Sequence, residues 1–256
     1  MSLISFQKKK DAEKLVCLTA YTHYMAALAA PSVDLILVGD SLGMVQYGMK
    51  STLSVTLDMM IMHGKAVVDG ASSQVPVIVD MPFGTYQESP EQAFRNAALI
   101  MQQTGCDGVK LEGGQEMADT IGFLVQRGVP VMGHIGLKPQ SVHVHGGYRM
   151  TGKHDTEKKQ IKADSDAISR SGCFAMVLEC VDSDLAAQIT NDVVCPTIGI
   201  GASVKCDGQI LVTEDILGMT GHKVPSFVKQ YADLSDTIRD SIENYTQDVK
   251  KGNLSD

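Results

Sequence analysis

The 256-residue chain carries a formal net charge of −8, and 44% of its residues are hydrophobic. This hydrophobic content excludes a disordered protein, and the length is sufficient for one large domain or two small ones. Because the chain is acidic and its basic residues form no stripe, nucleic acid is excluded as a partner.

No apolar run reaches the roughly 18 residues that a membrane-spanning helix needs. No apolar signal core follows the lysines within residues 1–10. We therefore expect a cytoplasmic protein without a membrane partner. The six cysteines lie scattered, with no C-x-x-C pair, and we expect reduced thiols that pack as small hydrophobic residues.

Short apolar or β-branched runs alternate along the chain with segments of helical period, which is typical of βα units. Several runs are almost continuously apolar, as expected for parallel strands that are covered on both faces. The expected strands are Val16–Thr19, Leu35–Val38, Val77–Val79, Val109–Leu111, Val131–Gly133, Met176–Leu178, Thr197–Ile200 and Gln209–Val212.

Helical patterns fill most of the gaps between these runs. One begins at Ser89, which suits an N-cap, with Gln92 at the reciprocal capping-box position. The other expected helices begin near Thr56 or span about 115–126, 156–171 and 229–251. The segment 43–73 is long for one crossover, and we expect it to combine a loop with the helix near Thr56.

Eight strands interleaved with helices match the size of a closed (β/α)8 barrel. An open doubly wound sheet is the competing architecture, because a count of strands does not separate the two. No proline- or glycine-rich linker divides the chain. We therefore expect a single domain over residues 1–256, with a C-terminal helix.

Polar side chains follow the expected strands where each one ends. Parallel strands of a barrel direct their C-terminal ends to one rim, so these residues are predicted to converge there. The strand-end set is Asp40, Ser41, Asp80, Lys110, Glu112, His134 and Glu179.

Carboxylates crowded on one rim repel each other unless a cation neutralises them, so this pattern indicates a metal ion. Asp40, Asp80 and Glu112 offer hard oxygen ligands, which suit Mg²⁺. Lys110 lies two residues before Glu112 on one strand and so shares its face, where it can meet a substrate carboxylate. We also place His134 among the substrate-binding residues.

Two further patterns allow more than one interpretation. His134, His143 and His145 permit a zinc site if residues 143–145 are extended, although we favour a loop there. The Gly199-Ile200-Gly201 stretch ends the seventh strand, where barrels often bind phosphate, but it equally suits a tight turn with close packing.

At these residues the chain closely resembles the ketopantoate hydroxymethyltransferase family, and the resemblance runs in order from about Leu15 to beyond Pro225. The matching stretches are residues 37–44, 80–83, 109–114, 133–137, 139–141, 146–148, 178–180, 199–202 and 207–212.

The resemblance implies the (β/α)8 fold of the phosphoenolpyruvate/pyruvate group and a homodecamer. It implies that Asp40 and Asp80 bind Mg²⁺ directly, and that Glu112 belongs to the metal site. It further implies that Ser41 and Lys110 hold the keto-acid carboxylate and that Glu179 is the general base.

The implied substrates are 3-methyl-2-oxobutanoate and methylenetetrahydrofolate. Glu179 is expected to remove the C3 proton, and the Mg²⁺-stabilised enolate then attacks the folate-borne methylene carbon. The chain departs from the family at Thr22, His143 and Ser203, which lie outside the inferred metal and base residues.

Three other functions remain open on the residues alone. The first is another Mg²⁺-dependent carbon–carbon lyase or mutase of the same barrel group. The second is an aldolase that forms a Schiff base on Lys110. The third is an inactive structural paralogue.

Overall fold

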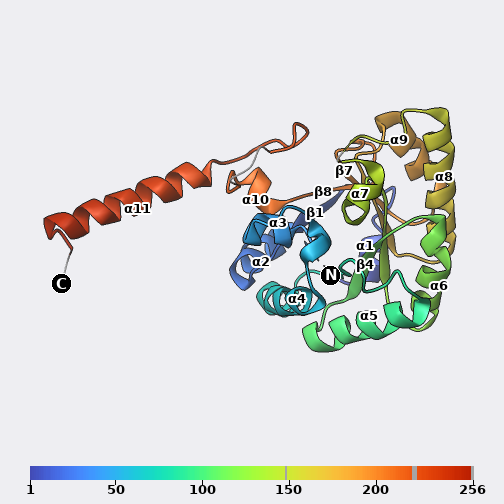
Figure 1. Cartoon of the computed structure of the whole chain (residues 1–256), viewed down its shortest axis with the longest axis horizontal. Coiled ribbons are helices and arrows are strands. Elements are labelled where there is room, and N and C mark those ends of the chain that lie inside the picture. Colours follow the sequence, from blue (N-terminus) through green and yellow to red (C-terminus); the bar gives the residue numbers. More distant parts are fainter. Residues whose placement is uncertain (148, 221–223, 255–256) are drawn as a thin grey trace. The chain divides into compact units, whose positions relative to one another are not determined.

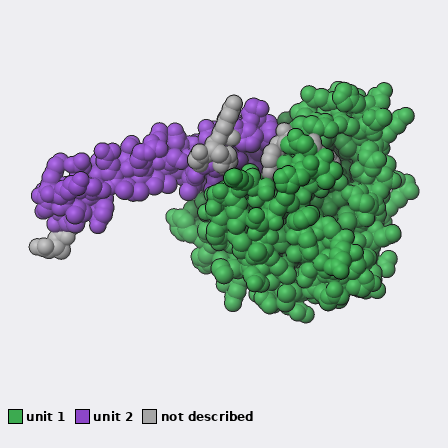
Figure 2. Space-filling view, in the orientation of Figure 1, with its two compact units in different colours: residues 1–210 green, residues 211–256 purple. Residues whose placement is uncertain are grey.

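The computed structural model describes residues 1–147, 149–220 and 224–254. It comprises two compact units, residues 1–210 and residues 211–256 (Figure 2). Within the described ranges, no helix has both the length and the apolar character needed to cross a bilayer. The single-domain organisation and the cytoplasmic location stay predictions.

The strands pair in sequence order, all parallel, and close into a barrel with helices between them (Figure 1). This confirms the predicted (β/α)8 barrel, and the open doubly wound sheet is therefore wrong. Every expected strand overlaps an observed one. The strands are β1 Leu15–Thr19, β2 Leu35–Val38, β3 Val77–Asp80, β4 Gly108–Glu112, β5 Val131–Gly136, β6 Ala175–Glu179, β7 Thr197–Ile200 and β8 Gly208–Leu211.

Helices follow most of the strands. The α-helices are α1 Leu3–Gln7, α2 His23–Ala29, α3 Leu42–Tyr47, α4 Leu57–Ala71, α5 Pro90–Thr104, α6 Ala118–Gln126, α7 Val142–His145, α8 Asp155–Arg170, α9 Ser183–Asp192, α10 Thr213–Ile216 and α11 Leu234–Lys251. The 3-10 turns are η1 Ala30–Ser32, η2 Thr52–Ser54, η3 Gln115–Met117 and η4 Pro139–Ser141.

The cap of α5 forms largely as the sequence predicts. The Ser89 hydroxyl accepts a hydrogen bond from the Gln92 amide at 3.1 Å. The Gln92 side chain accepts its own bond from the backbone N–H of Glu88 rather than from that of Ser89, also at 3.1 Å. The reciprocal bond of the capping box is therefore shifted by one residue.

Three local expectations need correction. The helix expected from 229 begins at Leu234, because residues before it leave the helical conformation at the Asp233 cap. The helix expected over 115–126 is divided into η3 and α6. Residues 143–145, where we favoured a loop, belong to the one-turn helix α7 and so are not extended.

Apolar side chains pack in two layers, one between the barrel and its helices and one inside the barrel. Inside the barrel, Ile78, Met132 and Val177 project from β3, β5 and β6. Phe6 of α1 joins this inner layer and packs edge-on against Phe174, with ring centroids 6.2 Å apart. The barrel is thus a packed core rather than a channel.

A partly buried ion pair connects the N-terminal segment to β7 and to the residue before β8. The Lys10 ammonium lies 2.9 Å from the Asp207 carboxylate, whose side chain is 5% exposed. The same carboxylate accepts bonds from the backbone N–H and the hydroxyl of Thr197. The Asp207 carbonyl also accepts the Leu15 N–H of β1, at the point where the barrel closes.

We expect Asp207→Ala to lower the free energy of unfolding by about 3–5 kcal/mol, because it leaves the buried Thr197 N–H without its acceptor and the partly buried Lys10 without its carboxylate partner. The control is Asp166→Ala, which removes an exposed pair with Arg170 on α8 and is expected to cost at most about 1 kcal/mol. Urea unfolding of both variants measures the difference. Equal losses would contradict the structural role of the Lys10–Asp207 pair.

Candidate active site

The strand register brings the predicted rim residues side by side. Asp80 is paired with Lys110 across β3 and β4, and Glu112 with His134 across β4 and β5. Glu179, the last residue of β6, is paired with Gly136 of β5. Residues that are paired in a parallel sheet project from the same face, so these side chains all meet at the C-terminal rim.

An apolar layer lies directly beneath these polar groups. Ile78, Met132 and Val177 of the inner core come two positions before Asp80, His134 and Glu179 on the same strands. Side chains two positions apart on a strand share a face. The rim is therefore a polar layer above a dry barrel interior, which strengthens the electrostatic interactions within it.

Lys110 and Asp80 form the central ion pair of the rim. The Lys110 ammonium lies 2.7 Å from one Asp80 oxygen, and both side chains are almost fully buried. Burial alone would lower the pKa of Lys110, but Asp80, Glu112 and Asp40 raise it above its ordinary value. The other Asp80 oxygen accepts the backbone N–H of Asp40 at 3.0 Å.

Asp40 and Glu112 lie in an environment that disfavours their ionised forms. Burial and the negative charge of Asp80 raise the pKa of Asp40 to about 7. Burial and the charge of Asp40 raise the pKa of Glu112 well above its ordinary value. The pKa of both groups is raised for the same two reasons. The carboxylates are buried away from water, and they lie close together with too little positive charge beside them.

His134 lies between two of the acids. Its Nε2 atom is 3.3 Å from a Glu179 oxygen, and its Nδ1 atom is 3.7 Å from a Glu112 oxygen. Burial lowers the pKa of His134, so the ring is neutral near pH 7. The Glu179 side chain is 19% exposed, against 3% for Glu112, which makes Glu179 the rim acid that a bound molecule reaches.

Ser41 completes the predicted set and is held by a residue that sequence reasoning missed. The Ser41 hydroxyl lies 2.8 Å from the hydroxyl of Tyr21, a buried residue that follows β1. Two other missed residues are Tyr86 and Gln140, which bond to each other and to the rim acids. Gln140 falls within a stretch quoted for the family resemblance, whereas the sequence carries no local signal for Tyr86.

The donor set fits a divalent cation that prefers hard oxygen ligands. Asp40, Asp80 and Glu112 act on the ammonium group of Lys110, and Glu179 adds its charge to the same rim. A cation would offset both causes that raise the pKa of Asp40, which are burial first and then the repulsion by Asp80. In the described ranges, no three acid, histidine or cysteine side chains converge as ligands of one ion. Mg²⁺ usually retains several waters and needs few protein ligands, so this arrangement suits it.

The other sequence interpretations can now be compared with the structure. The zinc alternative required an extended segment at His143 and His145, but that segment is helical. Gly201 has a left-handed φ of 59°, as expected for the tight turn. Gly199 packs closely against the Gln209 side chain.

Two departures from the family pattern have structural explanations. The Thr22 hydroxyl caps α2 by accepting the Met25 N–H, a role that Asp also performs. The φ of Ser203 does not lie in the left-handed region, so its backbone does not require the glycine that is usual there. His143 is exposed, and no contact in the described residues explains that substitution.

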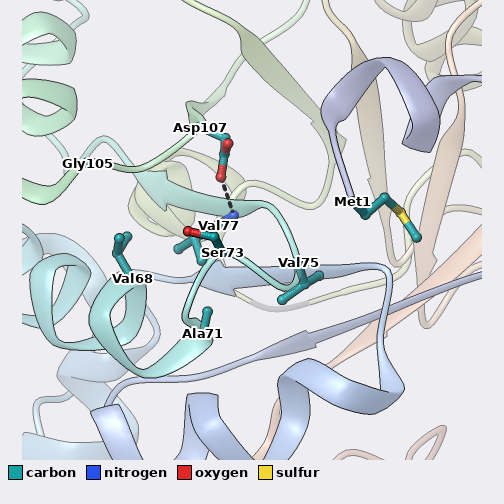
Figure 3. A pocket seen from close by; sticks show the side chains of 8 residues that line it. All are labelled: Met1, Val68, Ala71, Ser73, Val75, Val77, Gly105 and Asp107. Atoms are coloured by element: carbon teal, nitrogen blue, oxygen red, sulfur yellow. Dashed lines mark hydrogen bonds between the residues drawn. The ribbon is translucent and has the colours of Figure 1, made fainter.

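A separate cavity of about 220 Å³ lies at the other end of the strands (Figure 3). It is lined by Val75, which precedes β3, by Val77 at the start of β3 and by Asp107, which precedes β4. The Asp107 carboxylate accepts the Val77 N–H at 2.9 Å. Because this end of a barrel serves stability, the cavity is not the candidate active site.

Sequence comparisons identify close relatives. A sequence model of the family described as ketopantoate hydroxymethyltransferase matches residues 1–255. A 3-methyl-2-oxobutanoate hydroxymethyltransferase of Rhodospirillum rubrum is 57% identical over 247 residues, covering 96% of this chain and 88% of the relative. The enzyme of the same name from Agrobacterium fabrum is 54% identical over 252 residues, covering 98% and 90%.

Solved structures share the fold at low identity. Phosphonopyruvate hydrolase, in complex with oxalate and Mg²⁺, matches with a TM-score of 0.63 at 10% identity, covering 98% of this chain and 88% of that one. A 2,3-dimethylmalate lyase of the PEP mutase/isocitrate lyase superfamily matches with a TM-score of 0.62 at 16% identity and the same coverage. These likenesses support the predicted (β/α)8 fold.

The backbone next to Glu179 leaves no room for a side chain at Gly136. Gly136 has a φ of 93°, and an added Cβ would lie 2.4 Å from the Glu179 carbonyl oxygen. We expect Gly136→Ala to lower the free energy of unfolding by about 2–4 kcal/mol, because backbone strain and overlap add together. Urea denaturation provides the measurement.

Gly146→Ala is the matched control. Gly146 also has a left-handed φ, of 71°, but an added Cβ would meet nothing within 4 Å. Only the conformational cost of about 1–2 kcal/mol is therefore expected. A loss at Gly136 no larger than that at Gly146 would show that the contact with Glu179 is not tight.

Proposed function

This chain belongs to the ketopantoate hydroxymethyltransferase family, and we propose that the rim residues from Asp40 to Glu179 carry out the family's reaction. The enzyme transfers a hydroxymethyl group to 3-methyl-2-oxobutanoate and so forms ketopantoate. The observation that carries the residue assignment is the contact of Glu179 with His134, beside the buried acids and Lys110.

The keto acid is proposed to bind against Asp40, Ser41, Asp80, Lys110 and His134. Its carboxylate would be repelled by the rim acids alone, so it needs positive charge. The Lys110 ammonium provides part of that charge, and the Ser41 hydroxyl can donate to the substrate when it accepts from the Tyr21 hydroxyl. These two groups orient the carboxylate end of the substrate. The methine carbon, C3, then faces Glu179.

Asp40 and Asp80 are the residues that would bind Mg²⁺ directly, and Glu112 would belong to the metal site beside them. When bound, Mg²⁺ supplies Lewis-acid polarisation of the keto oxygen and stabilises the negative charge that develops there. Asp80 is already connected to both Lys110 and the Asp40 backbone, so its carboxylate is fixed in orientation. A fixed carboxylate loses less conformational entropy when it takes up an ion.

Glu179 is proposed to remove the proton from C3 of the keto acid. Its side chain is the accessible acid of the rim, and neutral His134 lies close enough to orient it without supplying a permanent charge. The resulting carbon nucleophile then attacks the methylene carbon of methylenetetrahydrofolate, and the hydroxyl oxygen comes from water. Tetrahydrofolate leaves as the second product.

Lys110 is poorly suited to the Schiff-base alternative. A lysine nucleophile must be uncharged, yet the neighbouring acids raise the pKa of Lys110 above its ordinary value. The ammonium group is also engaged with Asp80 at 2.7 Å. Both features favour a role in binding an anionic group.

We expect Glu179→Gln to retain keto-acid binding but to slow exchange of the C3 proton by at least 10²-fold, because the amide cannot accept a proton. NMR in deuterated water, without folate, measures the exchange. EDTA is expected to stop exchange in the unaltered enzyme and added Mg²⁺ to restore it. Wild-type exchange in the variant would remove Glu179 from this role.

We further propose that the enzyme assembles as a homo-oligomer, with the decamer implied by the family resemblance as its size. Helix α11 supports assembly, since it has no buried residue in the described chain. Ile238, Ile242, Tyr245 and Val249 follow one another at spacings of four, three and four, and so form an exposed apolar stripe on one face.

Ile242→Asp is therefore expected to reduce the assembled mass, because it places a charge within the stripe. Asp240→Asn, on the same helix but outside the stripe, is the control and is expected to assemble normally. Light scattering after size-exclusion chromatography gives the mass. An unchanged mass for Ile242→Asp would exclude the stripe as an assembly surface.

A further inference from the structure

Gln140 connects two acids that come from different strands. It lies in η4, after β5, and is 4% exposed. Its side-chain Nε2 donates to an Asp40 oxygen at 2.8 Å. Its backbone N–H donates to a Glu112 oxygen at 3.1 Å. One residue therefore holds the acid that follows β2 and the acid that ends β4.

The surroundings of the Gln140 amide determine its orientation. The second Nε2 hydrogen is donated to the Met81 carbonyl at 3.0 Å. On the other side, Oε1 accepts from the Tyr86 hydroxyl at 2.6 Å and from Gln87 Nε2 at 3.1 Å. A flipped amide would place its oxygen against the Asp40 carboxylate and the Met81 carbonyl, so the observed orientation is strongly preferred.

Tyr86 in turn fixes the Gln140 oxygen. Its ring is 1% exposed, and its hydroxyl accepts the backbone N–H of Glu112 at 3.1 Å. The hydroxyl proton has two possible acceptors, the Gln140 Oε1 atom at 2.6 Å and the Glu112 carbonyl oxygen at 3.3 Å. The shorter distance favours Gln140. One series of hydrogen bonds therefore connects Glu112, Tyr86, Gln140 and Asp40, and all four residues are buried.

We propose that Gln140 is a positioning residue, which fixes the Asp40 and Glu112 carboxylates relative to each other so that they bind a divalent cation with little rearrangement. The proposal rests on the function proposed above. Tyr86 acts through Gln140 by holding its amide oxygen. Groups that orient metal-binding side chains commonly change metal affinity by 10–100-fold when they are removed.

Gln140→Met tests the side chain, because methionine has a similar length but cannot donate to Asp40. The backbone N–H to Glu112 remains, so the variant isolates the contact with Asp40. We expect Mn²⁺, used as the paramagnetic probe, to bind 10–100-fold more weakly in electron paramagnetic resonance titrations without substrate. Wild-type affinity in a folded Gln140→Met variant would overturn the proposal.

Gln160→Met is the matched control. Gln160 also donates its amide to a buried carboxylate, that of Asp164 at 2.9 Å, but it belongs to α8 rather than to the rim. We expect its Mn²⁺ affinity to stay within about twofold of the wild type, which is the range of a surface change without contact to the site. An equal loss in both variants would indicate a general effect on folding and would contradict the proposal.

Tyr86→Phe keeps the test decisive if Gln140→Met fails to fold, because it removes one hydroxyl from an intact ring. A lost hydrogen bond of about 1 kcal/mol corresponds to roughly a fivefold weaker Mn²⁺ affinity. The double variant Tyr86→Phe/Gln140→Met is expected to lose less Mn²⁺ affinity than the sum of the two single losses, because the single variants share the Tyr86–Gln140 contact. Additive losses, or an unchanged Tyr86→Phe affinity, would refute this coupling.

The two proposals fail in different ways. If the unaltered enzyme neither binds Mn²⁺ nor exchanges the C3 proton, then the rim assignment itself is wrong. If it does both and Gln140→Met binds Mn²⁺ normally, only the positioning role of Gln140 is wrong.

Discussion

The parallel register of the closed barrel is the constraint on which the rest of the structure depends. It pairs Asp80 with Lys110, Glu112 with His134 and Gly136 with Glu179. A shift of one residue in any of these pairings would turn a polar side chain from the barrel interior to the helix layer. The apolar positions beneath the rim oppose such a shift, because they would leave the inner core together with it.

The electrostatics of the rim follow from that register. It concentrates carboxylates above a dry interior, where repulsion between them is weakly screened. Lys110 offsets part of the negative charge through Asp80, while burial and the neighbouring carboxylates raise the pKa of Asp40 and of Glu112. This imbalance is the physical reason for the proposal that a divalent cation and an anionic substrate bind there together.

The opposite end of the barrel has a different character. There Lys10, Asp207 and Thr197 form a closed set of buried contacts, and the Asp107 carboxylate is bonded to the Val77 backbone. These groups are paired with one another as donors and acceptors, whereas Lys110 balances only part of the negative charge of the rim acids. The contrast separates residues that maintain the fold from residues that are available for chemistry.

Local sequence was sufficient to place the eight strands, most helices and the polar residues at the strand ends, because apolar runs, caps and strand-end polar residues are signals within a few positions. Barrel closure and the contacts of Tyr21, Tyr86 and Gln140 were decided by tertiary structure. The Tyr86–Gln140 bond joins residues 54 positions apart, and the Gln140–Asp40 bond joins residues 100 apart. No local pattern encodes such a contact, since it exists only once the strands between those residues have closed into the barrel.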